Sequence, residues 1–500
     1  MARERGAGRR MRIDARLHGA RPNRLAVAVC AGGLSLLSQL AIAAEWTRSA
    51  SMSVGQVYSD NVELASENEN SDFYSTVMPT VSLQGQGARA SVGVNAAMEM
   101  NNRSGGGTGN FNPLLNATGN AELIEDFFFT DVFARAAQTT TDPFQGSSRT
   151  ALSENENAST TYSYGIAPSI KRRLGGFATF NAGTQWDEQI SANDDFDDST
   201  QQNFNASLTS GTDFTRLSWG LVGEHTITDY SNNASAGEGQ DDQYSSLSVP
   251  LGYRISRKWQ LTSSVGREWR DYDADTSSRD DDTWDAGVVW TPSPRTSLTV
   301  GYGDRYFDNS PHFDFSHRSK RTTLRASYER TLTTSRDLRA RTSSFAAENP
   351  FGLPFDPVTG QPIPLSGNRT FLDSGSIIEE RLEASVAVAG KRTTLTLRGA
   401  QSQQTREDNS EEGTFNDLGL NFGRSLSGKL SLNGGVTWEG DEDPDGLTAD
   451  TMIYDLGLNR RLGANTNLSF TYSYSDRDSE RPDDDYTENR VFLNLTFNFE

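Results

Sequence analysis

The sequence predicts an all-β protein, a transmembrane antiparallel up-and-down β-barrel of about 22 strands, within a range of roughly 18 to 24. Three observations predict this fold. The chain begins with an export leader, short segments of alternating apolar and polar residues follow one another to the C-terminus, and long polar connections alternate with tight turns. Beyond the leader there is no long apolar run, which excludes a helical membrane protein.

The first 43 residues have the pattern of a signal peptide. Eight arginines precede an apolar segment from Leu25 to Ile42, and Ala41-Ile42-Ala43 provides a small-x-small cleavage signal. We assign residues 1-43 to the signal peptide and 44-500 to the barrel. We expect export by the general secretory route to the outer membrane of a Gram-negative cell.

The mature chain is acidic and free of cysteine. The whole sequence carries 46 basic and 67 acidic residues, and removal of the leader leaves a net charge of about −27. Such acidity argues against nucleic acid as a partner and suits a surface that binds divalent cations, although a saline habitat explains it equally well. Cys30 lies in the leader, so disulfides and thiolate metal sites are excluded.

The strands follow one another as hairpins. The first is expected from Trp46 to Tyr58, the second from Phe73 to Gln84 and the third from Ala90 to Met100, with alternation between lipid-facing and lumen-facing residues. Long connections are expected near residues 101-113, 141-158, 190-199, 230-241, 273-282, 308-317, 346-375, 406-413, 440-450 and 476-487. Tight turns are expected near 125-126, 174-176, 211-213, 256-258, 292-295, 333-336, 390-391, 427-429 and 463-466.

The alternation of long and short connections predicts how the barrel is oriented in the membrane. Outer-membrane barrels keep their long loops outside and their short turns in the periplasm. Strand patterning begins directly after the leader, so we expect no plug domain and no TonB-dependent transporter. A barrel of this size without a plug is expected to enclose a wide, wet lumen, unless its loops fold into it.

The final strand ends the chain with a lipid-facing pattern. Its odd positions from Val491 to Phe499 are apolar, while Asn494, Thr496 and Asn498 are polar. An alternating strand with a terminal aromatic resembles the signal read by the barrel assembly machinery, although here Glu500 follows Phe499. The partners expected from this pattern are outer-membrane lipid and that machinery.

A motif after the first strand indicates which family of outer-membrane barrels the sequence resembles. The segment Tyr58-Ser-Asp60-Asn61-Val-Glu-Leu64 resembles the opening of a family of outer-membrane β-barrel porins found with exopolysaccharide and PEP-CTERM (exosortase) systems. The resemblance implies a role in polysaccharide secretion and no catalytic residues. The alternative is a strand end that turns into a loop, with Asn61 in a left-handed conformation.

The expected lumen wall contains a cationic stripe. If Leu324, Ala326 and Tyr328 face lipid, neighbouring arginines point inward, and guanidinium groups bind carboxylates and phosphates bidentately. The stripe comprises Arg305, Arg321, Arg325, Arg339, Arg341, Arg381 and Arg398. The alternative is that inward Glu329, Glu379 and Glu383 neutralise it. We further expect the connection from 348 to 374 to fold inward as a constriction.

Two functions remain open. The first is a porin-like conduit, either for secreted exopolysaccharide, in which case an anionic polysaccharide is the partner, or for general diffusion. The second is a structural or adhesive surface barrel with a closed lumen and acidic loops that bind cations. We expect no enzyme and no cofactor, because His225, His312 and His317 are the only histidines beyond the leader and no positioned nucleophile accompanies them.

Overall fold

A computed structural model describes residues 45–104, 110–146, 157, 159–192, 198–231, 241–272, 279–342, 347–348, 354–355, 376–407 and 410–499. The first residue of β1 is Glu45, so the expected signal peptide lies outside the described residues. Within the described residues no helix is both long and apolar enough to cross a membrane.

The described residues form one 22-stranded antiparallel sheet, a two-stranded ribbon and one short helix. The bounds of the elements are β1 Glu45–Ser59, β2 Asp72–Gln86, β3 Ala90–Arg103, β4 Asn110–Ile124, β5 Phe128–Thr139, β6 Ser159–Leu174, β7 Ala178–Ser191, β8 Asp198–Ser210, β9 Leu217–Ser231, β10 Asp241–Arg254, β11 Trp259–Tyr272, β12 Arg279–Ser293, β13 Thr296–Arg305, β14 Asp308–Arg318, β15 Thr322–Thr334, α2 Ser335–Thr342, β16 Ala347–Glu348, β17 Pro354–Phe355, β18 Ser376–Ala389, β19 Thr393–Arg406, β20 Glu412–Ser425, β21 Leu430–Glu442, β22 Thr448–Arg461, β23 Thr466–Ser479 and β24 Tyr486–Phe499.

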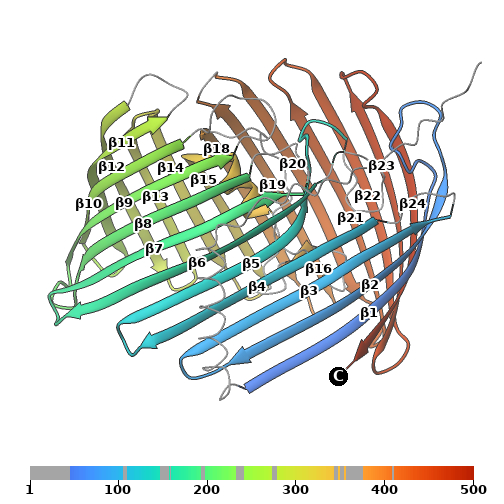
Figure 1. Cartoon of the computed structure of the whole chain (residues 1–500), viewed down its shortest axis with the longest axis horizontal. Helices are drawn as coiled ribbons and strands as arrows, with labels where there is room; N and C mark the ends of the chain where they lie inside the picture. The colour runs from blue at the N-terminus through green and yellow to red at the C-terminus, as the bar shows by residue number, and fades with distance from the viewer. Residues whose placement is uncertain are drawn as a thin grey trace, which may run out of the picture.

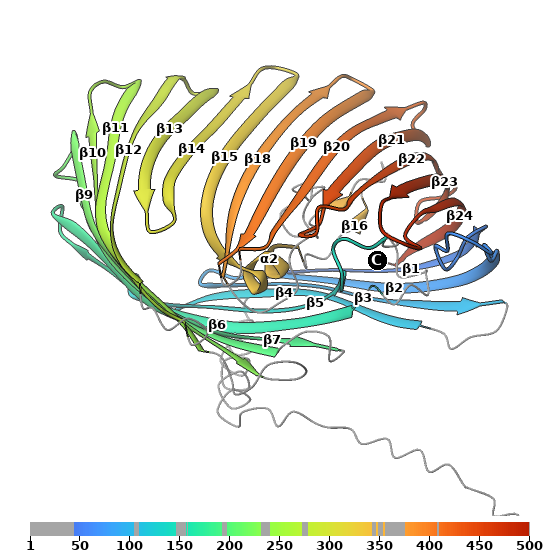
Figure 2. The same ribbon diagram turned by 90° about the horizontal axis from the view of Figure 1, so that it is seen from above.

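The large sheet closes on itself. Each strand pairs with the next one along the chain, and β1 also pairs with β24, in register from Ala50 opposite Phe499 to Ser59 opposite Arg490. Figure 1 shows the tilted strands side by side, and Figure 2 shows the ring from above, with β1 to β7 as a flat wall and β10 to β24 as an arch. Closure leaves no strand edge exposed, which a membrane-spanning sheet requires.

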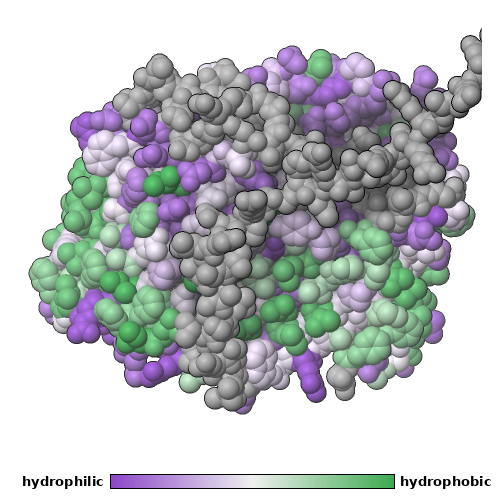
Figure 3. Space-filling view, viewed as in Figure 1, coloured by the Kyte–Doolittle hydropathy of each residue, from purple (hydrophilic) through white to green (hydrophobic). Residues whose placement is uncertain are grey.

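The alternation expected from the sequence holds in the strands. On β22 and β23, Leu456 faces Tyr472 and Leu458 faces Phe470, and these side chains are exposed on the outer surface. On β24, Leu493 and Phe499 are exposed in the same way, which confirms the lipid-facing pattern of the last strand. Apolar residues gather over the lower strands in Figure 3, while polar residues dominate the upper edge. The outer face therefore suits lipid.

The expected total of about 22 strands is confirmed, but two of the expected positions are wrong. Residues 308-317, expected as a long connection, form strand β14, so His312 and His317 lie on a strand. Residues 333-336, expected as a tight turn before another strand, lead instead into α2. The two errors compensate. Phe313 and Phe315 do alternate outward on β14, but Pro311 and the aspartates of this segment read as a loop.

Candidate functional site: the interior of the barrel

Two segments leave the wall and cross the interior at the end of the barrel that carries the long connections. The first follows β5. Its Phe144 is 9% exposed and stacks on Phe415 of β20, with ring centroids 5.1 Å apart and an interplanar angle of 19°. Since β5 belongs to the flat wall and β20 to the arch, this segment joins opposite walls (Figure 2).

The second segment is α2, which lies inside the ring (Figure 2). Thr334 caps it, because the Asp337 amide donates to the Thr334 hydroxyl and that hydroxyl donates back to the Asp337 carboxylate, at 3.1 and 2.8 Å. Arg336, 3% exposed, pairs with Asp187 of β7 and donates to the Ser199 hydroxyl of β8 at 2.8 Å. The helix is thereby fixed to the wall opposite its own strand.

These two segments meet in a small apolar cluster. It contains Phe144, Leu338 of α2, Ile377 of β18 and Phe415 of β20, with exposures of 9, 5, 2 and 1%. Burial of such side chains stabilises a contact by about 1.5–3 kcal/mol each. Because four separate elements contribute one side chain each, the cluster has to come apart when either segment moves.

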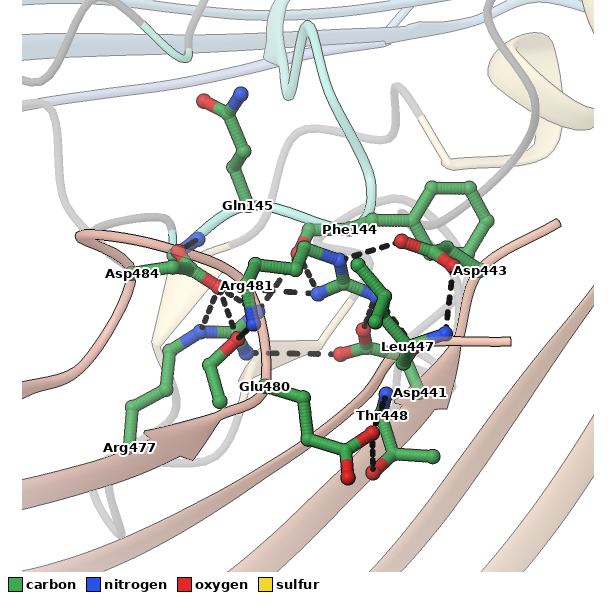
Figure 4. Close-up of polar contacts among 12 residues, drawn as sticks. Phe144, Gln145, Asp441, Asp443, Leu447, Thr448, Arg477, Glu480, Arg481 and Asp484 are labelled. Atoms are coloured by element: carbon green, nitrogen blue, oxygen red, sulfur yellow. Dashed lines mark hydrogen bonds and ion pairs between the residues drawn. The ribbon is translucent and has the colours of Figure 1, made fainter. Parts of the chain in front are cut away.

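Ion pairs hold the first segment in place. Arg477 and Arg481 both donate to the backbone carbonyl of Phe144, Arg477 at 2.7 Å. Arg477 Nη2 also binds Asp484 at 2.7 Å, and the Asp484 carboxylate accepts the Gly146 amide at 2.8 Å. Figure 4 shows both guanidinium groups converging on this carbonyl.

The same arginines are anchored to the end of β21 and to the loop that follows it. Arg481 binds Asp441 at 2.9 Å and Asp443 at 2.8 Å. Burial opposes ionisation of Asp443, but hydrogen bonds from Arg481 and from the amides of Leu447 and Asp445 outweigh it, so the pKa of this carboxyl lies below its ordinary value. The pKa of the Arg481 guanidinium is raised against its partial burial by hydrogen bonds to Asp443 and Asp441.

A second ionic group lines the arch. Arg305 of β13 binds Glu268 of β11 at 2.6 Å, and the Tyr244 hydroxyl donates to the same carboxylate at 3.0 Å. Arg270, 3% exposed, binds Glu407 after β19 at 3.0 Å. Arg305 and Arg270 are therefore each matched by an acid on this part of the wall.

The seven arginines of the expected stripe lie in different settings. Arg305, Arg325, Arg381 and Arg398 occupy lumen-facing positions, since they alternate with outward-facing residues of their strands such as Tyr302, Leu382 and Leu397. Arg325 and Arg398 also lie in one row, with Ser385 between them. Arg321 lies in the turn before β15. Arg339 and Arg341 belong to α2 and not to a strand.

Carboxylates accompany part of this stripe. Arg381 donates to Glu383 at 2.7 Å and to Glu379 at 3.4 Å, and Arg305 is paired with Glu268. Arg325 has no ion pair among the described residues. The connection expected as a constriction, 348 to 374, lies outside the described residues except for the ribbon strands β16 and β17.

The motif Tyr58 to Leu64 forms a clasp where the first strand meets the last. Asp60 accepts hydrogen bonds from the amide and the side chain of Asn489 at 2.7 and 2.8 Å. Asn61, fully buried, donates to the carbonyls of Ala65 and Thr487 at 2.9 and 3.0 Å. The left-handed residue is Leu64, with φ of 53°, and not Asn61.

Beside the clasp, an aromatic pair and a buried apolar cluster lie on opposite faces of the sheet, because neighbouring strand positions point to opposite sides. Tyr58 packs on Phe73 with ring centroids 4.9 Å apart, and Val57, Val62 and Tyr74 are buried against Phe492 of β24. In this structure the motif therefore has a role in closing the barrel.

The acidic loops are partly matched by arginine. Asp441, Asp443 and Asp484 bind Arg477 and Arg481, and Asp280 and Asp282 lie 3.5 and 3.2 Å from Arg267. Within the part of the chain that the structure describes, no group of three or more metal-binding side chains is found. Cation binding by these loops stays a prediction.

Sequence reasoning did not single out Phe144, Arg336, Arg477 or Arg481. A signal is present at Phe144, because an aromatic residue between Pro143 and Gln145 in a polar connection has no strand in which to bury itself. No such signal marks the arginines, because their acidic partners are distant in sequence or lie within stretches that are acidic throughout.

No family model and no curated protein matches the sequence. The structure is similar to solved outer-membrane proteins. It matches a variant of the FrpB iron transporter from Neisseria meningitidis with a TM-score of 0.55 and 10% identity, over 93% of this chain and 83% of the other. It also matches a mutant ferric enterobactin receptor from Pseudomonas aeruginosa, in complex with enterobactin, with a TM-score of 0.52 and 11% identity, over 90% and 81% of the chains.

Likeness at this identity shows the fold alone. Barrels of 22 strands in known outer-membrane transporters hold a plugged lumen, so the expectation that this protein has no plug domain stays a prediction. The closed sheet, its apolar outer face and these matches make the chain a 22-stranded β-barrel of the outer membrane.

Proposed function

We propose that this protein is a gated conduit of the outer membrane, whose outer end is closed by two of its own segments. The observation that carries the proposal is the cluster of Phe144, Leu338, Ile377 and Phe415, in which segments from different walls meet inside the lumen. The contacts around it are mostly ionic and hydrogen-bonded. Such contacts exchange with water at modest net free energy, which suits a closure that opens and recloses.

The proposed cargo is an anionic polymer, with secreted exopolysaccharide as the first candidate. Two observations support it. The clasp sequence resembles that of barrels found with exopolysaccharide systems, and Arg325 and Arg398 lie in one row of the lumen wall. Uptake of an iron chelate is suggested by the names of the similar iron transporter and ferric enterobactin receptor, and for this protein it is supported only by the shared fold.

The test uses a cysteine pair. In the variant Phe144→Cys/Phe415→Cys the two thiols replace stacked rings, and no other cysteine competes after removal of the leader. The refolded barrel is measured in planar bilayers. We expect discrete openings in the native protein, few openings when the pair is oxidised and restored openings after reduction. Each single-cysteine variant is the matched control and should ignore the redox change.

The alternative is a structural or adhesive barrel with a closed lumen, favoured by the burial of the Arg336–Asp187 ion pair that fixes α2 to the opposite wall. It predicts no conductance in any redox state. Equal conductance of the reduced variant and of the oxidised variant with a verified cross-link would also overturn the gate, because ions would then pass by another route. If openings occur, block by an anionic but not by a neutral polysaccharide supports the proposed cargo.

A further inference from the structure

The end of the barrel that carries the short turns contains a cationic pocket. It has a volume of about 650 Å³ and lies where three successive turns, β10–β11, β12–β13 and β14–β15, approach one another. Five basic side chains line it, and no carboxylate does. They are Arg257, Lys258, Arg295, Arg318 and Arg325.

These five cations differ from five other arginines that point into the barrel. Arg270, Arg305, Arg336, Arg381 and Arg477 each bind a carboxylate. For the five pocket cations no ion pair occurs within the described residues, although the protein has 67 acidic and only 46 basic residues. Like charges collected around one cavity repel each other, and an anion between them removes that repulsion.

Most of the strand residues that line the pocket point toward the lumen, and two of them, Thr296 and His317, occupy positions in the lipid-facing row. Its residues Ser297, Ser316, Arg318, Thr323 and Arg325 occupy lumen-facing positions, because the alternating positions carry the lipid-facing residues Leu298, Phe315 and Leu324. An anionic lipid headgroup would need cations directed outward. The geometry therefore favours a ligand that arrives through the periplasm or through the lumen.

The chemistry of the lining narrows the ligand further. Four guanidinium groups bind carboxylate or phosphate in a bidentate way, and the hydroxyls of Thr291, Ser293, Ser297 and Ser316 can bind sugar or phosphate oxygens. A volume in this range is that of a small-molecule site. One carboxylate would leave most of the charges unmatched.

We propose that this pocket is a docking site for a soluble polyanion at the periplasmic mouth, namely a segment of an acidic or phosphorylated glycan. The site rests on the proposed conduit for its biological meaning, since it would collect the cargo before transit. Binding itself does not require that the lumen opens, so the two proposals can fail separately.

The experiment measures binding to the refolded barrel by titration calorimetry with three probes, an oligogalacturonate, tripolyphosphate and a neutral maltooligosaccharide. In the pocket variant, Arg257, Lys258, Arg295, Arg318 and Arg325 are all replaced by Gln. The control variant replaces Lys171, Arg172, Arg173, Lys391 and Arg392 by Gln, which removes the same charge from the end of β6 and from the β18–β19 turn, at the same end of the barrel. All of these side chains are exposed, so both variants are expected to fold.

We expect the native barrel and the control to bind a charged probe with affinities within about twofold of each other, and the pocket variant to lose at least about tenfold, because several charge-assisted hydrogen bonds are lost. The neutral probe should not bind. The smaller variant Arg318→Gln/Arg325→Gln should show a partial loss. Preference for oligogalacturonate identifies a carboxylate ligand, and preference for tripolyphosphate a phosphate ligand.

Equal loss in the pocket and control variants would mean nonspecific attraction and would overturn the proposal, as would unchanged binding in the pocket variant. Competition by anionic lipid in nanodiscs, absent with zwitterionic lipid, would assign the pocket to headgroups and overturn the soluble ligand. A barrel that binds the probe but never conducts ions would overturn the proposed gated conduit and would still support the proposed binding pocket.

Discussion

At the scale of single residues, the charge of Asp443 connects the outer loops to the segment that closes the lumen. Asp443 binds Arg481, and Arg481 donates to the carbonyl of Phe144. Neither group lies in a strand. A change in the charge of this one loop carboxyl is therefore transmitted to the interior of the barrel through a single guanidinium.

Acidification should loosen this connection. The pKa of Asp443 is lowered in the folded protein, so its contribution is complete above the ordinary aspartate value of about 3.9 and is lost as the pH falls through the lower folded value. A spin label on Gln145→Cys, an exposed neighbour of Phe144, should become mobile only in that acid range.

The variant Asp443→Asn should show part of this mobility already at neutral pH, because Arg481 loses one of its charged partners and keeps Asp441. The exposed Asp445→Asn serves as a control, since its side chain makes no ion pair among the described residues. An equally rigid label in native protein and Asp443→Asn, at acid and neutral pH alike, would contradict the connection.

At the scale of the element, α2 shows why a short polar segment can be helical. Its intrinsic signals are modest, an N-cap formed by Thr334 with Asp337 and one buried leucine. An isolated helix of this length would not persist in water. The salt bridge between Arg336 and Asp187 and the packing of Leu338 supply the rest. Tertiary contacts thus stabilise this element.

The variant Arg336→Gln should release α2 from the opposite wall. Loss of one partner from a buried pair costs about 3–5 kcal/mol, because the remaining Asp187 carboxylate is left buried without a counter-ion. Hydrogen exchange of the amides in α2 should accelerate accordingly, while the strands keep their protection. The double variant Arg336→Gln/Asp187→Asn should recover part of the loss. Unchanged exchange in the single variant would show that the ion pair does not hold the helix.

At the scale of the whole molecule, the barrel depends on joining its first strand to its last. The register of β1 with β24 extends over ten residue pairs, and the clasp of Asp60 and Asn61 lies just beyond it. These contacts connect residues more than 400 positions apart, so they close the largest possible loop in the chain. Forming them late is expected, since long loops are slow to close.

The variant Asn61→Ala should weaken this closure. It leaves the carbonyls of Ala65 and Thr487 and the amide of Ala65 without their buried partner, at about 1–3 kcal/mol for each unsatisfied group. Urea unfolding in lipid vesicles, followed by tryptophan fluorescence, should show a lower midpoint. Asn70→Ala in the same loop is the control, because that side chain is exposed and makes one 3.4 Å hydrogen bond. Equal midpoints for both variants would contradict a structural role of the motif.

The sequence by itself determined the class of fold, the strand count and the face of most strands. The two-residue period of apolar side chains and the alternation of long and short connections are both local patterns. Each strand of a membrane barrel has one face in contact with lipid and the other in contact with water, which imposes that period. The pattern failed at β14 and α2, where proline, aspartate and arginine are compatible with more than one local conformation and the neighbours decide between them.

Only the tertiary structure decided what lies inside the barrel. The partners of Phe144, Arg336 and Arg477 come from strands on other walls, and which wall a loop reaches depends on closure of the whole ring. The same reason applies to the cationic pocket, since its side chains come from three turns separated in sequence. Local alternation specifies which face a residue has, and only the closed ring specifies which residues meet across it.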